Sequence, residues 1–306
     1  MRFLDVKTDY AFKRVFGAQE SAPILISFLN AVLEYEGEHR IVSLEIIDPY
    51  QAPKLAGMKD TFVDVKAKLA NGKNVIIEMQ VVHSKNIEQR ILYNAAKQYA
   101  NQLQRGEDYH LLNPVIALTL VDFTLFEDIE SYLSRFVLIE KETLVKYTDD
   151  VELVFIELPK FTKTEDELVS VEDKWLYFIK HAGHLTAIPQ SLNEPCIVDA
   201  FGRINEAALT PEELELQQKR HEFIQIQRTS IELAEEKGRA EGREEGLEEG
   251  IEIGVEQGRA EGLEEGIEKG ALLAKQAIAR NLLDVLDDAT IAAKTGLSLE
   301  QVAALR

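Results

Sequence analysis

The chain has 306 residues, of which 45% are hydrophobic, enough for a sizeable core and for about two domains. Its 34 basic and 54 acidic side chains give a net charge of −20, which excludes a protein that binds polyanions through bulk charge. The single cysteine, Cys196, excludes an intrachain disulfide and a cysteine-based zinc site. The charged first thirty residues contain no signal-peptide pattern, and no apolar run approaches the roughly 18 residues of a membrane span. We therefore expect a cytoplasmic protein with no membrane contact.

The first half of the chain predicts alternating helices and strands. Helices are expected over 8–16, begun by Thr8 and ended by Gly17, and over 21–33, where Ser21 is the predicted N-cap. The expected strands cover 41–48, 61–69, 74–82, 115–121, 136–139 and 151–158. A long amphipathic helix over 84–104 separates the third strand from the fourth. This order predicts an α/β half with a central sheet.

One stretch of this half departs from the acidic balance. Residues 54–105 hold nine basic and four acidic side chains, a net charge of +5. The basic residues are Lys54, Lys59, Lys66, Lys68, Lys73, Lys85, Arg90, Lys97 and Arg105. If the protein handles a nucleic acid, its charge permits contact here, and a chance fluctuation on a solvated surface is the alternative.

The second half is predicted to be helical from Thr164 onward. Thr210 and Pro211 are typical of an N-cap and a first helical position, and two glutamates follow at the positive end of the helix. Nine glycines then recur at every fourth position from Gly238 to Gly270. Because four residues advance a helix by about 400°, the glycine line drifts by about 40° per step. We expect either a solvated stalk or self-association through a second copy of the chain.

Two minor patterns complete the helical half. Residues 291–305 resemble a helix–turn–helix, but Arg306 is the only cation near the second helix, so we interpret this segment as a capping or self-association hairpin. His181 and His184 have zinc-ligand spacing without a further ligand nearby, which argues against zinc.

Two carboxylates on the hairpin over 61–82 are the candidate site. Side chains alternate along a strand, so Asp64 and Glu78 each lie on the polar face of their strand. A two-residue turn at Asn71-Gly72 pairs Asp64 with Met79 and puts the two carboxylates on opposite faces. A three-residue loop over 70–72, with Gly72 left-handed, pairs Asp64 with Glu78 instead. Carboxylates that meet in this way need a proton or cation between them, and oxygen ligands suit Mg²⁺.

Several blocks of the chain resemble the PD-(D/E)xK nuclease fold, and in particular its recombination-promoting nuclease, or putative transposase, branch. The blocks are LDVKTDYAFK with VFG at 4–17, Asp64-Val65, IEMQ at 77–80, RILY with AK and Tyr99 at 90–99, PVI at 114–116 and Asp122-Phe123. The resemblance covers roughly residues 3–160. It implies an α/β restriction-endonuclease-like core with a central mixed sheet flanked by helices, followed by an all-helical C-terminal extension.

The resemblance also implies a Mg²⁺-dependent DNA endonuclease that promotes recombination or transposition-like processing, with Mn²⁺ as a substitute ion. Asp64, Glu78 and the Met79 backbone carbonyl would hold the metal. Gln80 stands where the fold's name expects lysine, and an amide can orient water or phosphate but supplies no charge. A catalytically weakened interaction protein is therefore the alternative.

Neighbouring residues are candidates for supporting roles. Lys66 or Lys97 would supply the missing cation, and Asp9 is either an outer metal contact or a helix first-turn acid. Arg90, Tyr93 and Lys97 share one side of their helix and would contact the DNA backbone, unless Tyr93 is core and the cations are solvated.

The sequence thus predicts four segments. A nuclease-like domain spans 1–160, and a helical accessory region follows over 161–227. The glycine-repeat helix covers 228–270 and a small helical hairpin covers 271–306, so a homo-oligomer would form through the C-terminal helical region.

Overall fold

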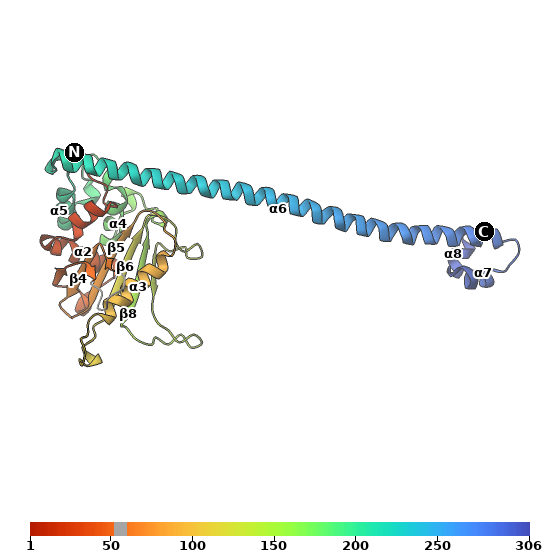
Figure 1. The fold of residues 1–306 in the computed structure, drawn as a ribbon, viewed down its shortest axis with the longest axis horizontal. Helices are drawn as coiled ribbons and strands as arrows, with labels where there is room; N and C mark the ends of the chain where they lie inside the picture. The colour runs from red at the N-terminus through yellow and green to blue at the C-terminus, as the bar shows by residue number, and fades with distance from the viewer. Residues whose placement is uncertain (52–59) are drawn as a thin grey trace. The chain divides into compact units, whose positions relative to one another are not determined.

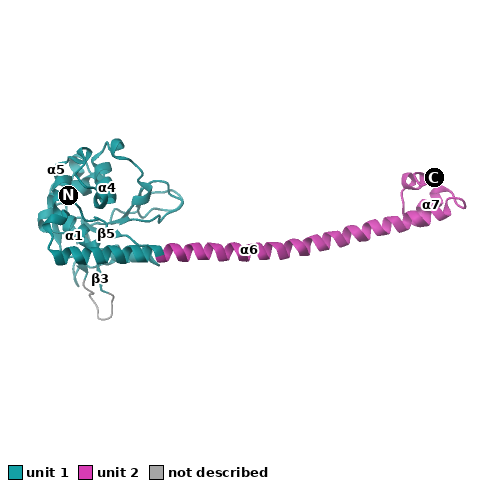
Figure 2. Ribbon diagram, turned by 90° about the horizontal axis from the view of Figure 1, so that it is seen from above, with its two compact units in different colours: residues 1–229 teal, residues 230–306 magenta. Residues whose placement is uncertain are grey.

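The computed structural model describes residues 1–51 and 60–306 and divides the chain into two compact units, residues 1–229 and residues 230–306 (Figure 2). The helices expected after residue 160 pack into the core of the first unit, through Trp175, Phe178 and Phe201. Lys54 and Lys59, two members of the basic stretch, lie outside the described residues.

A six-stranded mixed sheet forms the centre of the first unit. Its strands are β1 (Leu44–Ile47), β4 (Val65–Leu69), β5 (Asn74–Gln80), β6 (Val115–Val121), β8 (Val151–Glu157) and β7 (Leu133–Phe136), in this spatial order. The pairs β5/β6 and β6/β8 are parallel and the others antiparallel. A separate pair joins β2 (Tyr50–Gln51) to β3 (Thr61–Phe62). The central strands β5 and β6 are buried along almost their whole length because both faces of the sheet are covered.

Helices cover the two faces of this sheet (Figure 1). On one face lie α1 (Asp9–Phe16), α2 (Ala22–Val32), α4 (Val171–His181) and α5 (Pro195–Arg203), which share the main core with Val65, Ile77 and Met79. On the other face lies α3 (Ile87–Ala100), which packs on Ile76, Val121 and Phe155. This arrangement confirms the expected α/β fold with flanking helices.

Side-chain caps set where several of these helices begin. Thr8 caps α1 by accepting from the Ala11 N–H (3.4 Å). Ser21 precedes α2 as expected, but its buried hydroxyl makes no capping bond. Thr210 and Glu213 form a reciprocal capping pair at the start of α6 (Pro211–Leu282), which continues into the second unit.

Strand ends differ most from the prediction. The strand expected over 136–139 ends at Phe136, because β7 pairs with β8 earlier in the chain. The strand expected over 61–69 is divided into β3 and β4, with Val63 and Asp64 between them. That interruption positions the candidate site.

The second unit contains most of α6, together with α7 (Asp288–Thr295) and α8 (Leu299–Ala303). Ile291, Leu297 and Val302 pack with Ala279 of α6 in a small core. Among the described residues no single helix is long and apolar enough to cross a membrane. The bent pair Asp9–Phe16 and Gln19–Val32 passes that test only together, and its apolar residues belong to the main core.

Candidate active site at the β4–β5 hairpin

The hairpin adopts the register of the three-residue loop. Val65 pairs with Ile77 and Ala67 with Val75, so the series continues to Leu69, whose N–H donates to the Lys73 carbonyl (2.8 Å). Gly72 has φ +88°, the left-handed conformation that this loop requires. Of the two turns open to the sequence, the structure therefore has the one that would set Asp64 across from Glu78 if the strands continued in plain alternation.

A β-bulge changes the face of the sheet on which the Asp64 side chain lies. The Asp64 N–H donates to the Ile77 carbonyl (3.1 Å), and Val65 is also the partner of Ile77, so two consecutive residues oppose one. Val63 packs with Ile76 on the α3 face, whereas Val65 packs in the main core on the α1 face. The bulge thus turns the Asp64 side chain toward α1. The sequence pattern, read as plain alternation, did not reveal this bulge.

The Asp64 carboxylate is largely enclosed on that face. Its Oδ2 accepts from the Met79 N–H (2.8 Å), and its Oδ1 lies 3.6 Å from Lys13 Nζ. Burial raises its pKa, the Met79 N–H lowers it, and the neighbouring Asp9 carboxylate raises it again, with a result of about 7. Met79 therefore contacts Asp64 through its N–H.

Asp9 is the partner that shares the Asp64 proton. Burial raises the Asp9 pKa, but the Lys13 ammonium and the hydrogen bond with Asp64 outweigh it and hold that pKa below its ordinary value. Asp9 Oδ1 lies 2.6 Å from Lys13 Nζ, and its Oδ2 lies 3.3 Å from Arg220 Nη2. Below about pH 7 the pair therefore favours a proton on Asp64 and the negative charge on Asp9, and a cation could take the place of that proton.

Glu78 lies in a different environment, on the α3 face. It is 5% exposed, its Oε1 accepts from Asn94 Nδ2 (2.6 Å), and its Oε2 lies 3.4 Å from the Gln80 amide. Burial raises its pKa, while Asn94 and the charge of Arg90 oppose that rise. In this structure the Glu78 carboxylate is therefore bonded to α3 and Gln80, whereas Asp64 is bonded to Met79 and α1.

The cations expected from the sequence are also on the α3 side or buried. Lys97 is 5% exposed, donates to Thr61 Oγ1 (3.2 Å) and lies 5.9 Å from the centre of the Tyr93 ring. Lys66 is opposite Ile76, and burial lowers its pKa. Arg90 is exposed and Tyr93 is 38% exposed, so these two can meet a ligand from solvent, whereas Lys97 is almost completely buried.

Five residues around the site had no assigned role in the sequence. Lys13 and Arg220 bind the carboxylates, as described above. Asp122, at the end of β6, lies 3.0 Å from Lys7 Nζ and 2.5 Å from Arg228 Nη2, and its N–H donates to the Gln80 carbonyl (2.9 Å). The four-residue spacing from Asp9 to Lys13 could have indicated their pairing, but no local pattern reports contacts from α6.

The fit of this site to a divalent metal rests on oxygen donors. Asp64 and Asp9 are carboxylates in hydrogen-bond contact, which Mg²⁺ could join in place of a proton. Among residues 1–51 and 60–306 no group of three His, Cys, Asp or Glu side chains is arranged as a complete metal site, and this includes His181 and His184. Glu78 or backbone oxygens would have to contribute as well.

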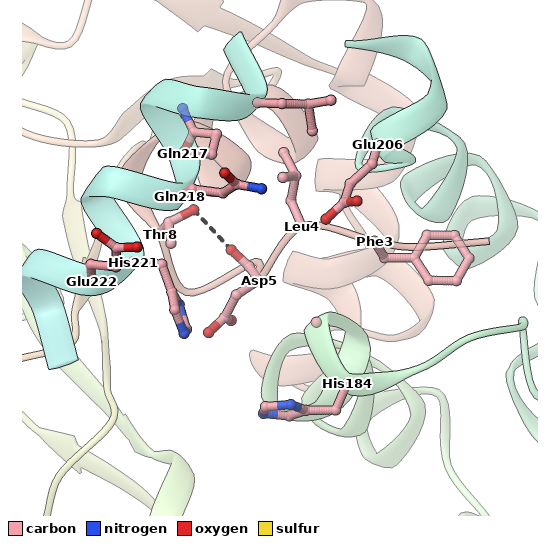
Figure 3. A pocket seen from close by; sticks show the side chains of 12 residues that line it. Phe3, Leu4, Asp5, Thr8, His184, Glu206, Gln217, Gln218, His221 and Glu222 are labelled. Carbon is pink, nitrogen blue, oxygen red and sulfur yellow. Dashed lines mark hydrogen bonds between the residues drawn. The ribbon is translucent and has the colours of Figure 1, made fainter. Parts of the chain in front are cut away.

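A separate cavity of about 300 Å³ lies between the start of α6 and the first residues of the chain (Figure 3). Asp5, His184 and His221 line it, and the Thr8 hydroxyl donates to the Asp5 carbonyl (2.8 Å). The candidate site residues do not line this cavity.

A mixed sheet whose central hairpin carries Asp64 and a Glu78-x-Gln80 motif, between flanking helices, places the first unit among the PD-(D/E)XK nuclease folds. The chain belongs to the PD-(D/E)XK nuclease family transposases, whose family model matches residues 6–234. This match confirms the family that the sequence blocks resemble, and it supports a nuclease or transposase-like role with DNA as the substrate. Comparisons with curated proteins and with solved structures gave no match.

Proposed function

We propose that this protein is a Mg²⁺-dependent DNA endonuclease whose breaks promote recombination or transposition-like processing. The observation that carries the proposal is the buried Asp64 carboxylate in contact with Asp9, on the hairpin that the family motif occupies. A close, partly buried carboxylate pair of this kind is costly without a cation or proton between its members.

Each residue then has a distinct task. Asp64 and Asp9 would hold the metal, with the Met79 carbonyl as a further oxygen donor, and Glu78 would join them only after its carboxylate turns away from Asn94. Such a metal lowers the pKa of a bound water and neutralises charge on the attacked phosphate. Gln80, already beside Glu78, would orient water or phosphate through its amide.

The exposed face of α3 would contact the DNA backbone. Arg90 offers a guanidinium and Tyr93 a partly exposed phenol one helical turn later. Lys97 would contribute by fixing Tyr93 and Thr61 rather than by meeting phosphate, because its ammonium is buried.

Nicking of supercoiled plasmid in the presence of Mg²⁺ tests the proposal. We expect Asp64→Asn, Asp9→Asn and Glu78→Gln to lower the rate at least about 100-fold, since each removes a charge that the reaction uses. Glu88→Gln, which changes an exposed carboxylate on α3, is the matched control and should nick like the wild type. Equal nicking by the wild type and Asp64→Asn would reject this site.

We also propose that the protein forms a homo-oligomer through α6. The nine repeat glycines have open space where a Cβ would lie, and the apolar residues that follow several of them are well exposed. These residues are Leu247, Ile251, Val255, Leu263 and Ile267, each 58–66% exposed. A helix with this many glycines is marginal alone, since each costs about 1 kcal/mol against alanine, and a second copy would cover the apolar residues.

Light scattering of the full chain and of residues 1–229 tests this oligomer. We expect a smaller assembly after truncation, and the double variant Ile251→Glu, Val255→Glu should reproduce that loss in the full chain. An unchanged mass in both would contradict the proposal.

The alternative function is an interaction protein that keeps the nuclease fold without efficient cleavage. The uncharged Gln80 in place of lysine is the observation that favours it. Absence of metal-dependent nicking in a wild-type chain that still oligomerises through α6 would support this alternative.

A further inference from the structure

A nuclease of this fold with glutamine at position 80 lacks a cation beside its carboxylates. Charge builds on the phosphate oxygens as a phosphodiester is cleaved, and a positioned ammonium stabilises that charge where an amide cannot. The two lysines that the sequence suggests do not contact Asp64 in any described interaction. Lys66 is opposite Ile76 on the α3 side, and Lys97 is buried against Thr61 and Tyr93.

The bulge brings a different lysine to Asp64. Because Asp64 and Val65 both oppose Ile77, the carboxylate faces α1 rather than α3. On α1, Lys13 follows Asp9 by one helical turn, and its Nζ lies 2.6 Å from Asp9 Oδ1 and 3.6 Å from Asp64 Oδ1.

The backbone of Lys13 is fixed by the packing of α1, whereas its side chain is partly exposed to solvent. The Thr8 cap sets where α1 begins, and Ala11 and Val15, on the side of the helix opposite Lys13, are completely buried. The side chain of Lys13 is nevertheless 42% exposed, so its ammonium meets both the carboxylates and solvent. Arg220, the other cation at this position, binds Asp9 Oδ2, on the opposite oxygen from Lys13.

We propose that Lys13 supplies the cation that Gln80 cannot, by contacting the phosphate at the Asp64 site. This inference rests on the proposed nuclease function. Without a divalent ion, the Lys13 ammonium pairs with the Asp9 and Asp64 carboxylates. With substrate present, the same ammonium turns to the phosphate bound at this site. The lysine of the fold's motif is thus replaced by one from the first helix.

Nicking and Mn²⁺ binding, measured together, test this role. For Lys13→Met we expect nicking to fall about 100-fold, whereas Mn²⁺ affinity, followed by electron paramagnetic resonance, stays equal or becomes up to about 10-fold tighter because a competing cation is gone. Lys13→Arg should keep at least a tenth of the rate, and Lys68→Met, an exposed lysine on β4, should match the wild type. Unchanged nicking by Lys13→Met overturns the proposal. A parallel loss of nicking and Mn²⁺ binding overturns it too, because Lys13 would then only support the carboxylates.

Chemical rescue gives a second test. In a Cys196→Ser background, Lys13→Cys should be inactive and regain activity after treatment with 2-bromoethylamine, which rebuilds an ammonium at nearly the same position. No recovery despite complete alkylation would overturn the role of the charge.

DNA binding tests the Lys13 contact separately from the nuclease activity. If the wild type does not nick plasmid, binding of a short duplex in Ca²⁺ is measured against salt concentration. Lys13→Met should then weaken binding at least about 5-fold and lower the salt slope by about 1, as the loss of one phosphate contact predicts. An unchanged slope would overturn the Lys13 contact.

Discussion

Replacing Asp64 with asparagine should stabilise the folded protein at alkaline pH. Asparagine resembles the protonated carboxyl, because its oxygen can accept from the Met79 N–H and its amide can donate to Asp9. The pKa of Asp64 is 3.8 in an ordinary setting and about 7 in the folded chain, where burial is the largest cause. The unfolded chain therefore releases this proton first, and the folded wild type loses stability as pH rises from about 4 to 7.

The size of this effect follows from the two pKa values. Each pH unit between them corresponds to about 1.4 kcal/mol, which gives a ceiling of ~4 kcal/mol above pH 7. Since Asp9 shares the proton and Asp64 keeps some exposure, we expect half of that ceiling, a difference in the free energy of unfolding of ~2 kcal/mol. Asp64→Asn should thus match the wild type near pH 4 and exceed it by ~2 kcal/mol at pH 8.

Urea unfolding in EDTA between pH 4 and 8.5 measures this difference. Trp175 is the single tryptophan and is fully buried in the first unit, so its fluorescence reports the unfolding of that unit. Mg²⁺ should then restore stability to the wild type at pH 8 and leave Asp64→Asn unchanged. A difference between the two proteins that is constant with pH would refute the reasoning, and Glu88→Gln controls for the loss of a carboxylate alone.

Three further predictions concern stability and assembly. Gly72→Ala should destabilise the first unit by about 1–2 kcal/mol, because φ is +88° and the new methyl would meet Asn113; Gly106→Ala, which has a similar φ but open space, should lose less in the same urea titration. Arg228→Ala should cost about 1–3 kcal/mol, since it leaves the largely buried Asp122 with one fewer cation, whereas breaking the exposed Lys219–Glu215 pair should change urea midpoints little. Replacing alternate repeat glycines of α6 by alanine should raise helical circular dichroism by removing about 1 kcal/mol of cost each. If light scattering shows that the same variant dissociates, the glycines lie at the contact between copies, and an unchanged mass would place that contact elsewhere on α6.

Some features could be predicted because they depend on neighbours in the sequence. Thr8 and Thr210 begin their helices because a hydroxyl oxygen can satisfy an N–H two or three residues later, and this needs no distant partner. The apolar residues of 115–121 indicated a strand covered on both faces, and β6 is buried along its full length. The hairpin loop was narrowed to two alternatives by Asn71-Gly72, since few residues accept a left-handed conformation.

Tertiary structure decided where the site's charges lie. Alternation along 61–69 cannot show that Asp64 and Val65 both oppose Ile77, because a bulge is set by packing of the flanking residues on two different faces. Arg220 reaches Asp9 across 211 positions of the chain, a contact that no local propensity encodes. The sequence alone indicated Asp64, Glu78 and Gln80 as the candidate site residues and narrowed the local turn that presents them. Only the folded chain decided that Asp64 meets Asp9 and Lys13, because long-range packing turns its side chain toward the first helix.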